Sequence, residues 1–197
     1  IRVLCEMFFG TLPPELLTLV FQPMITSMDN PLGICVGNAL EVAEAAELLS
    51  GRIKNNLYDL CIDISSNMVS MGKEIPLIDA RAEVIVAIES KKAYAKFIEF
   101  ITYQKGNLDE MKISSKTKEI KSLKSGTITS IDALKISEVS CKLGSGKMTL
   151  DDVIDPTVGI FLNKQIGDKV EEGEVLCTLY YNKTDEDFNI LNAYVIE

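Results

Sequence analysis

The sequence has 197 residues, of which 47% are hydrophobic, and its 20 basic and 29 acidic residues give a formal net charge of −9. Such a chain can bury a core in one large domain or two small ones, while its acidity argues against a general nucleic-acid or anionic-membrane surface. Histidine is absent, so this chain cannot carry Ser-His-Asp, Cys-His or histidine–metal chemistry, and acid–base work would need Asp, Glu, Lys, Tyr or Cys.

The N-terminal region, residues 1–28, gives the weakest signal. Acidic residues, a glycine and three prolines interrupt this apolar region well short of the ~20 apolar residues of a membrane span, and they fit a signal peptide poorly. Glu15–Phe21 could form a short helix or part of a strand, and Gln22–Ser27 could form a buried strand. Because the first residue is Ile1 rather than methionine, the sequence is consistent with a piece of a longer product.

The cysteines lie far apart, at positions 5, 35, 61, 141 and 177. They form no C-x-x-C pair, so a zinc site or a thioredoxin-like motif has no support. Their number is odd, and each has apolar neighbours. Reduced and mostly buried thiols of a cytoplasmic protein are therefore predicted.

Residues 31–51, PLGICVGNALEVAEAAELLSG, form a glycine-punctuated turn that runs into a helix. The first two glycines suit backbone bends that a Cβ would obstruct. Asn38 is the candidate N-cap, and Glu41 is its candidate capping-box partner. Helix formers continue through Ala39–Leu49, and Gly51 favours the end of the helix.

Glu44 lies on this helix between Leu40 and Leu48, one turn away on either side. Apolar residues occur nearly all round the helix, as expected for one that is packed on several sides. Glu44 would then occupy a partly buried seam, where an ionised carboxylate needs a cation or hydrogen-bond donors. The pattern alone leaves open the alternative that Glu44 is a solvated glutamate beside two exposed leucines.

Three more helices are predicted from apolar residues that recur every three to four positions. They span Asn56–Met71, Ile78–Ser90 and Lys92–Gln104. Asp79 is the candidate N-cap of the second helix, and Phe100 is among the residues expected to pack inward from the third. The first half of the chain is therefore predicted to be mostly helical.

Asp109–Lys124 changes character, because lysines are interleaved with serines in a run that is typical of a solvated linker or edge. We place the domain boundary here. The glycine turn Leu143–Lys147 could bind an anion or simply end a helix. The remaining residues favour strands, tight turns and one short helix. Strands are expected at Thr127–Asp132, Thr157–Leu162, Cys177–Tyr181 and Ala193–Ile196, the helix at Ala133–Lys142, and a short strand between turns at Gly167-Asp168 and Glu172-Gly173.

Two independent sets of motifs resemble one enzyme family. Pro31–Glu41, PLGICVGNALE, is similar to the signature of the pyrimidine-nucleoside and thymidine phosphorylases, and the Glu-Ala helix continues it. Leu143–Lys147, LGSGK, and Ile166–Val170, IGDKV, follow the order of motifs in the family's C-terminal domain. The resemblance extends over residues 25–182, whereas residues 1–22 do not match the family.

The resemblance implies an α/β (α+β) fold in two parts. Residues 1–121 would be an incomplete, helix-rich part of the phosphorylase α/β (glycosyltransferase) domain, and residues 122–197 an α/β-hammerhead C-terminal domain. The family's phosphate-binding loop and base-binding residues belong to a preceding half and have no positions in this chain. The resemblance therefore assigns no catalytic and no substrate-binding residue here.

The activity that the resemblance implies is reversible phosphorolysis, in which the co-substrate phosphate converts a pyrimidine nucleoside into the free base and a pentose 1-phosphate. Such enzymes are pentosyltransferases of nucleoside salvage, and they are cytoplasmic homodimers with no nucleic-acid or membrane partner. The alternative is a non-catalytic remnant that acts only as a folded binding or structural module. The residues that would distinguish uridine from thymidine are not in this chain.

A monovalent cation, typically potassium, is the cofactor that the resemblance implies for these residues. Its ligands would be the backbone carbonyls of Leu32 and Cys35 and the carboxylate of Glu44, with the remaining ligands from the preceding half. Oxygen ligands suit a hard cation, and a single carboxylate among neutral carbonyls favours a low charge.

Overall fold

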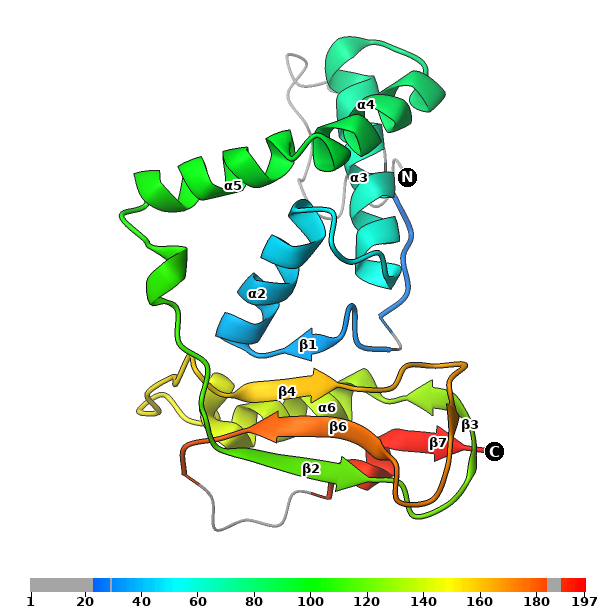
Figure 1. The fold of residues 1–197 in the computed structure, drawn as a ribbon, viewed down its shortest axis with the longest axis vertical. Coiled ribbons are helices and arrows are strands. Elements are labelled where there is room, and N and C mark those ends of the chain that lie inside the picture. The colour runs from blue at the N-terminus through cyan, green and yellow to red at the C-terminus, as the bar shows by residue number, and fades with distance from the viewer. Residues whose placement is uncertain (1–22, 29, 184–188) are drawn as a thin grey trace, which may run out of the picture.

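A helical first half and a β-rich second half make up the chain, as Figure 1 shows. The structure, a computed structural model, describes residues 23–28, 30–183 and 189–197. In that view the four long helices of the first half lie above the strands, and the chain returns from the last of them to enter the β-rich half. The mixed α/β fold expected from the sequence is confirmed.

All four helices predicted in the first half are present, and their ends lie within two residues of the predicted ones. They are α2 (Asn38–Leu49), α3 (Asn56–Lys73), α4 (Leu77–Glu89) and α5 (Lys92–Tyr103). Their shared core contains Leu48, Tyr58, Ile62 and Ile88. The apolar periodicity located these helices because a helix of a small domain must bury one face against its neighbours.

The N-terminal ends of two helices differ from the predicted caps. Asn38 is the first residue of α2 rather than its N-cap, since Gly37 occupies that position with φ 133°. The predicted capping box between Asn38 and Glu41 is not formed, and Glu41 Oε1 instead accepts a hydrogen bond from the N–H of Gly37, the observed N-cap, at 2.9 Å. α4 begins directly after Pro76, so Asp79 lies within its first turn rather than at its N-cap.

Phe100 does not pack inward as predicted, since 59% of its surface is exposed. Phe97, Ile98 and Ile101 on the same helix are half-buried, and no described residue of α5 is fully buried. α5 contacts α2 and α4 and extends away from the other helices in Figure 1. The helix therefore lies at the margin of the helical layer, where its apolar face is only partly covered.

In the described residues, the strands of the second half, together with β1 of the first half, form two antiparallel sheets. One contains β1 (Cys35–Val36), β2 (Thr117–Lys121), β4 (Gly159–Leu162) and β6 (Val175–Tyr180), in the order β1-β4-β6-β2. The other contains β3 (Gly126–Ile131), β5 (Lys169–Val170) and β7 (Tyr194–Ile196), in the order β5-β3-β7. α6 (Ala133–Ser140) continues into a π-helical turn at Cys141–Ser145. Its buried Ile136 belongs to the same hydrophobic core as the buried residues of these strands. The strands and the short helix predicted for this half are confirmed.

The lysine-rich stretch Asp109–Lys124, expected to be a solvated linker or edge, contains an edge strand, because Thr117–Lys121 forms β2 at the end of its sheet and pairs with β6. Ile120 is the one buried residue of the strand, and exposed charged neighbours are typical of an edge strand protected from further pairing. One apolar residue gives too little alternation to reveal a strand in the sequence. The sheet thus includes residues before the boundary at 121/122, and separate folding of residues 122–197 stays a prediction.

The segment before the glycine-punctuated turn is irregular. Residues 23–28 have no regular secondary structure and are exposed, so the buried strand expected at Gln22–Ser27 is not formed. An extended segment becomes a strand only beside a partner, and no strand of the described residues pairs with it. Gln22 and the element expected at Glu15–Phe21 lie outside the described residues. Within the described ranges, no helix is both long and apolar enough to cross a bilayer.

Strand β1 joins the two halves of the chain. Cys35 lies opposite Phe161 and Val36 lies opposite Ile160 in an antiparallel pair with β4. The N–H of Ala39, at the start of α2, donates to the carbonyl of Pro156 at 3.0 Å. These contacts fix α2, and the side chains that it carries, relative to the sheet of the second half.

Candidate functional site

Glu44 is buried, with 4% of its surface exposed. It extends from α2 toward the preceding turn, where its Oε1 accepts a hydrogen bond from the N–H of Ile34 at 2.9 Å. Its Oε2 accepts one from the N–H of Cys35 at 3.0 Å. A third donor is the side-chain amide of Asn55, whose Nδ2 lies 2.8 Å from Oε1. The alternative of a solvated helix glutamate is therefore wrong, and Glu44 occupies a buried seam.

The turn before β1 is shaped around this carboxylate. A Cβ on Gly33 would lie 2.6 Å from Glu44 Oε1, and Gly33 has φ 80°, so the position requires glycine. The N–H of Gly33 donates to Asn56 Oδ1 at 3.2 Å. Residues 33–35 thus receive contacts from α2, through Glu44, and from the start of α3, through Asn56.

The charge of Glu44 is balanced by dipoles rather than by a cationic side chain. In the described part of the chain, no lysine or arginine forms an ion pair with it. Three N–H groups donate to its oxygens instead, and a carboxylate has about four lone-pair positions. Buried charges in proteins are paired with an opposite charge or coordinate a metal ion, so a buried carboxylate without a cationic side-chain partner is a candidate cation ligand.

The three residues expected to bind a cation lie together. Leu32, Cys35 and Glu44 line one cavity of about 470 Å³, which Asn30 and Glu41 also line. Nowhere in residues 23–28, 30–183 and 189–197 do three or more His, Cys, Asp or Glu side chains form a group that could hold a metal ion. A cation in this cavity would therefore depend on backbone carbonyls and one or two carboxylates, a donor set that fits a monovalent ion better than a divalent one. The ligand roles themselves stay a prediction.

Cys35 would take part through its backbone, not its thiol. The carbonyl of Ile34 accepts from the N–H of Leu162 at 2.7 Å, and in an antiparallel ladder the next residue turns its N–H and C=O to the opposite edge. The N–H of Cys35 accordingly faces the outer edge of β1, where it donates to Glu44 Oε2 at 3.0 Å. Burial, and then the negative charge of Glu44, raises the pKa of the Cys35 thiol to about 12, so the thiol is neutral and is neither a nucleophile nor a thiolate ligand at neutral pH.

The glycine turn Leu143–Lys147 makes structural contacts. The carbonyl of Gly144 accepts from the N–H of Asp155 at 2.8 Å. The carbonyl of Ser145 accepts from Asn38 Nδ2 at 2.9 Å, which gives Asn38 a role that its expected capping function did not anticipate. Lys147 Nζ donates to a carbonyl within its own loop. The turn ties α2 to the second half, and these contacts favour the helix-ending interpretation.

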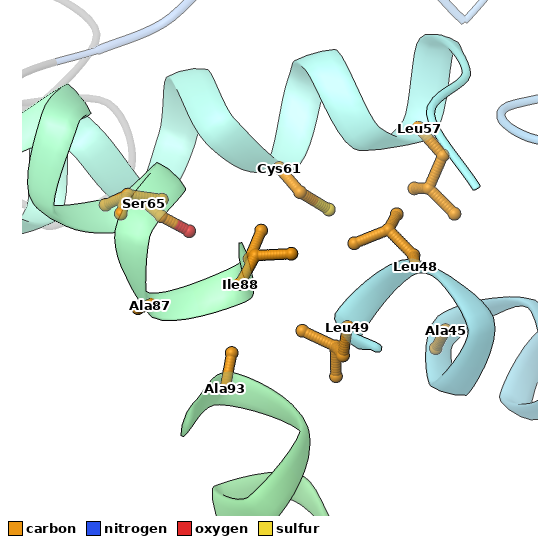
Figure 2. Close-up of a pocket in the computed structure, with 10 residues that line it drawn as sticks. Ala45, Leu48, Leu49, Leu57, Cys61, Ser65, Ala87, Ile88 and Ala93 are labelled. Atoms are coloured by element: carbon orange, nitrogen blue, oxygen red, sulfur yellow. The ribbon is translucent and has the colours of Figure 1, made fainter. Parts of the chain in front are cut away.

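A second cavity, of about 400 Å³, lies among α2, α3, α4 and α5 (Figure 2). Leu48, Cys61 and Ile88 point into it from three helices, and small side chains such as Ala87 and Ala93 leave the space open. Burial raises the pKa of the Cys61 thiol. With an apolar lining and no charged group, this cavity is a packing gap in the helical core, not a reaction centre.

Asn55 and Asn56 are the site residues that the sequence analysis missed. Asn55 is the N-cap of α3 and its Oδ1 accepts from the N–H of Tyr58 at 3.1 Å. An asparagine directly before a helical pattern is a recognisable N-cap signal. Its second contact, to Glu44, depends on how α3 folds back on α2, and no local pattern reveals that.

Comparison with known proteins identifies relatives of both halves. Residues 127–195 match the family described as the pyrimidine nucleoside phosphorylase C-terminal domain. Pyrimidine-nucleoside phosphorylases of Staphylococcus aureus strains bovine RF122 / ET3-1 and USA300 are each 42% identical over 173 residues, which is 83% of this chain and 40% of each relative. The chain thus spans about two fifths of the length of the curated relatives that it matches.

Proposed function

Over the segment that it shares with these relatives, the chain belongs to the pyrimidine-nucleoside phosphorylase family, and we propose that it forms the C-terminal part of such an enzyme. The reaction would be that of a pentosyltransferase of pyrimidine salvage. Phosphate attacks C1′ of a pyrimidine nucleoside, and the free base and a pentose 1-phosphate are released. The observation that carries this proposal is the 42% identity, which extends over 83% of the chain and so includes residues of both halves.

The chain's contribution would be structural support and one cation site. Neither a catalytic nor a substrate-binding residue is assigned to it, and its residues would act by holding the turn of residues 32–35 against α2. Glu44 and the backbone carbonyls of Leu32 and Cys35 would hold a monovalent cation such as potassium. When bound, the cation would supply a positive charge that offsets the Glu44 carboxylate. The burial of Glu44 and its position with Leu32 and Cys35 on one cavity support this assignment.

The partners proposed for the complete enzyme are a pyrimidine nucleoside and phosphate, in a cytoplasmic homodimer. The second candidate is a non-catalytic module that persists only as a folded binding or structural unit. The absence of histidine from the sequence favours this candidate for the chain by itself, because the family resemblance places a histidine beside the base. The two candidates differ in one measurable property, which is support of phosphorolysis when the chain is joined to the part of a relative that it does not match.

A chimera tests the proposal. The part of the Staphylococcus aureus enzyme that precedes the match would be fused to this chain, and phosphate-dependent release of uracil and thymine would be measured. We expect turnover that scales with chimera concentration, and lower turnover in the Glu44→Gln chimera than in a Glu47→Gln chimera. Glu47 lies on the same helix but is paired with Arg52 at the surface, so it is a matched control. A folded chimera without turnover would favour the non-catalytic module.

A further inference from the structure

The side chain of Asn55 makes two contacts of opposite polarity. Its Oδ1 accepts from the N–H of Tyr58 at 3.1 Å, which caps α3, and its Nδ2 donates to Glu44 Oε1 at 2.8 Å. The amide orientation is fixed by these partners, since the reversed orientation would place oxygen against a carboxylate and nitrogen against an N–H. Asn55 therefore contacts the charge of Glu44 through one end and holds a helix through the other.

Helix capping alone does not explain an asparagine here. Aspartate and serine cap helices about as well as asparagine, because capping needs only an acceptor oxygen. Neither of them can donate an amide N–H to Glu44. The donor end is thus the part of Asn55 that depends on Glu44, and it donates to that carboxylate beside the backbone N–H groups of Ile34 and Cys35.

An aspartate at this position would place a second carboxylate beside Glu44, which lines the cavity. It would keep the cap on α3 but place a carboxylate oxygen at hydrogen-bond distance from Glu44 Oε1. Two carboxylates at that separation repel each other, so they cannot both stay ionised unless a cation lies between them. Such a pair of oxygen ligands suits a divalent ion such as Ca²⁺.

We propose that Asn55 is a specificity-determining positioning residue that keeps a single buried negative charge at Glu44 and thereby makes the cavity a site for a monovalent rather than a divalent cation. This inference rests on the proposed cation site for its physiological meaning. The contact that it concerns, between the side chains of Asn55 and Glu44, lies within this chain and can be tested there.

The test compares Asn55→Asp with Asn56→Asp in the 197-residue chain. Both variants add one carboxylate near the same turn, but Asn56 contacts Gly33 and Leu57 through Oδ1 and has no hydrogen bond to Glu44. Urea denaturation midpoints would be measured with choline, potassium, calcium or magnesium chloride at matched ionic strength. A cation that binds only the folded state raises the free energy of unfolding by RT ln(1 + [L]/Kd), so at equal concentration a more tightly bound cation gives a higher midpoint.

We expect Asn55→Asp to unfold at a lower urea concentration than the wild type in choline chloride and to recover in calcium chloride. Its apparent calcium affinity should be at least about tenfold higher than that of the wild type or of Asn56→Asp, because calcium affinity rises with the number of charged ligands. Equal calcium responses of Asn55→Asp and Asn56→Asp would overturn the proposal, because the added charge would then act without regard to Glu44.

A double variant covers the case in which Asn55→Asp does not fold. Combining Glu44→Gln with Asn55→Asp restores one negative charge and allows the introduced glutamine amide to donate to the new carboxylate. The reference is Glu44→Gln alone, which carries the same glutamine. A double variant at least as stable as Glu44→Gln, without calcium dependence, supports the proposal, and a double variant less stable than Glu44→Gln overturns it. An inactive chimera leaves these midpoints unaffected, so failure of the proposed function is distinguishable from failure of this inference.

Discussion

Gly37 and Gly159 lie backbone against backbone: a Cβ on Gly37 would lie 2.8 Å from the Cα of Gly159, and a Cβ on Gly159 would lie 3.1 Å from the Cα of Gly37. Gly37 directly follows β1, and Gly159 begins β4. The contact therefore occurs where the helical half joins the sheet of the second half. Because neither residue has a side chain, α2 can begin at the surface of the sheet, with Glu44 held over the turn before β1.

Alanine at either glycine should destabilise the fold. Gly37→Ala and Gly159→Ala should each lower the free energy of unfolding by roughly 1–3 kcal/mol, the usual cost of forcing extra atoms into a packed contact. Gly72→Ala is the matched control, because a Cβ there meets nothing within 4 Å and the residue lies within α3. It should be neutral or stabilise by roughly 0.5–1 kcal/mol. Urea denaturation of the three variants measures this, and equal midpoints for all of them would contradict the role of the glycine pair.

Glu44→Gln should also destabilise the chain. A glutamine keeps the shape but turns one acceptor oxygen into an NH₂ group, which would face the backbone N–H of Ile34 or Cys35. A buried donor left against another donor costs about 1–3 kcal/mol. Glu47→Gln removes a charge from the exposed face of the same helix and should change the free energy of unfolding by less than about 1 kcal/mol. Equal stability of the two variants would indicate that the hydrogen bonds on Glu44 make no net contribution to the free energy of unfolding.

The fold was most predictable where one periodicity dominates a long segment. α2 and α3 repeat apolar residues every three to four positions over 12 and 18 residues, and both were located to within two residues. β1 has two residues, and its pairing with β4 joins segments more than 120 residues apart. No local pattern encodes such a pair. β2 was missed for a related reason, since only Ile120 of its five residues is buried.

The candidate site was predictable in its centre but not in its surroundings. The position of Glu44 between two leucines gave burial as one of two alternatives, and the structure decides between them. The donors to its carboxylate come from a turn ten residues earlier and from Asn55, eleven residues later. Their convergence depends on the packing of α3 against the turn, which is a tertiary property. Gly33 was expected for its backbone freedom, but its lack of a Cβ also leaves room for the Glu44 carboxylate.

Limited proteolysis should separate the two halves between α5 and β2. Lys105 and Lys112 lie outside strands and long helices, whereas Lys118 and Lys121 belong to β2 and pair with β6. A protease cuts backbone that can unfold locally, so a lysine-specific enzyme should cut after Lys105 and Lys112 first. Mass spectrometry of early digestion products identifies the sites. Cleavage after Lys118 or Lys121 at the same rate would show that β2 is not stably paired.

The buried thiols should make stability fall at alkaline pH. Burial raises the pKa of both Cys35 and Cys177 from 9.0 to about 12. The folded state then retains a proton that the unfolded state releases above pH 9, so this stability is fully present below pH 9 and is lost as the pH rises toward 12. Between these two pH values, each thiol lowers the free energy of unfolding by up to about 1.4 kcal/mol per pH unit. Urea midpoints between about pH 8 and 11 should therefore decrease, and the slope should be smaller for Cys35→Ala. An unchanged slope in that variant would contradict the assignment for Cys35.

The 197-residue polypeptide assayed by itself should not catalyse phosphorolysis. Its sequence has no histidine, and the residues that the family resemblance assigns to phosphate and base have no counterparts in it. Removal of one electrostatic donor from an enzyme typically costs about 100–1000-fold in rate, and here the whole set would be missing. Phosphate-dependent release of thymine or uracil by the purified chain, compared with a control without protein, measures this. The chimera of the same chain is the positive control, because it differs only in the added segment. Turnover by the chain alone that increases with its concentration would show that reactive groups lie among these residues, and the cavity that contains Glu44 and Glu41 would be the first place to search for them by substitution.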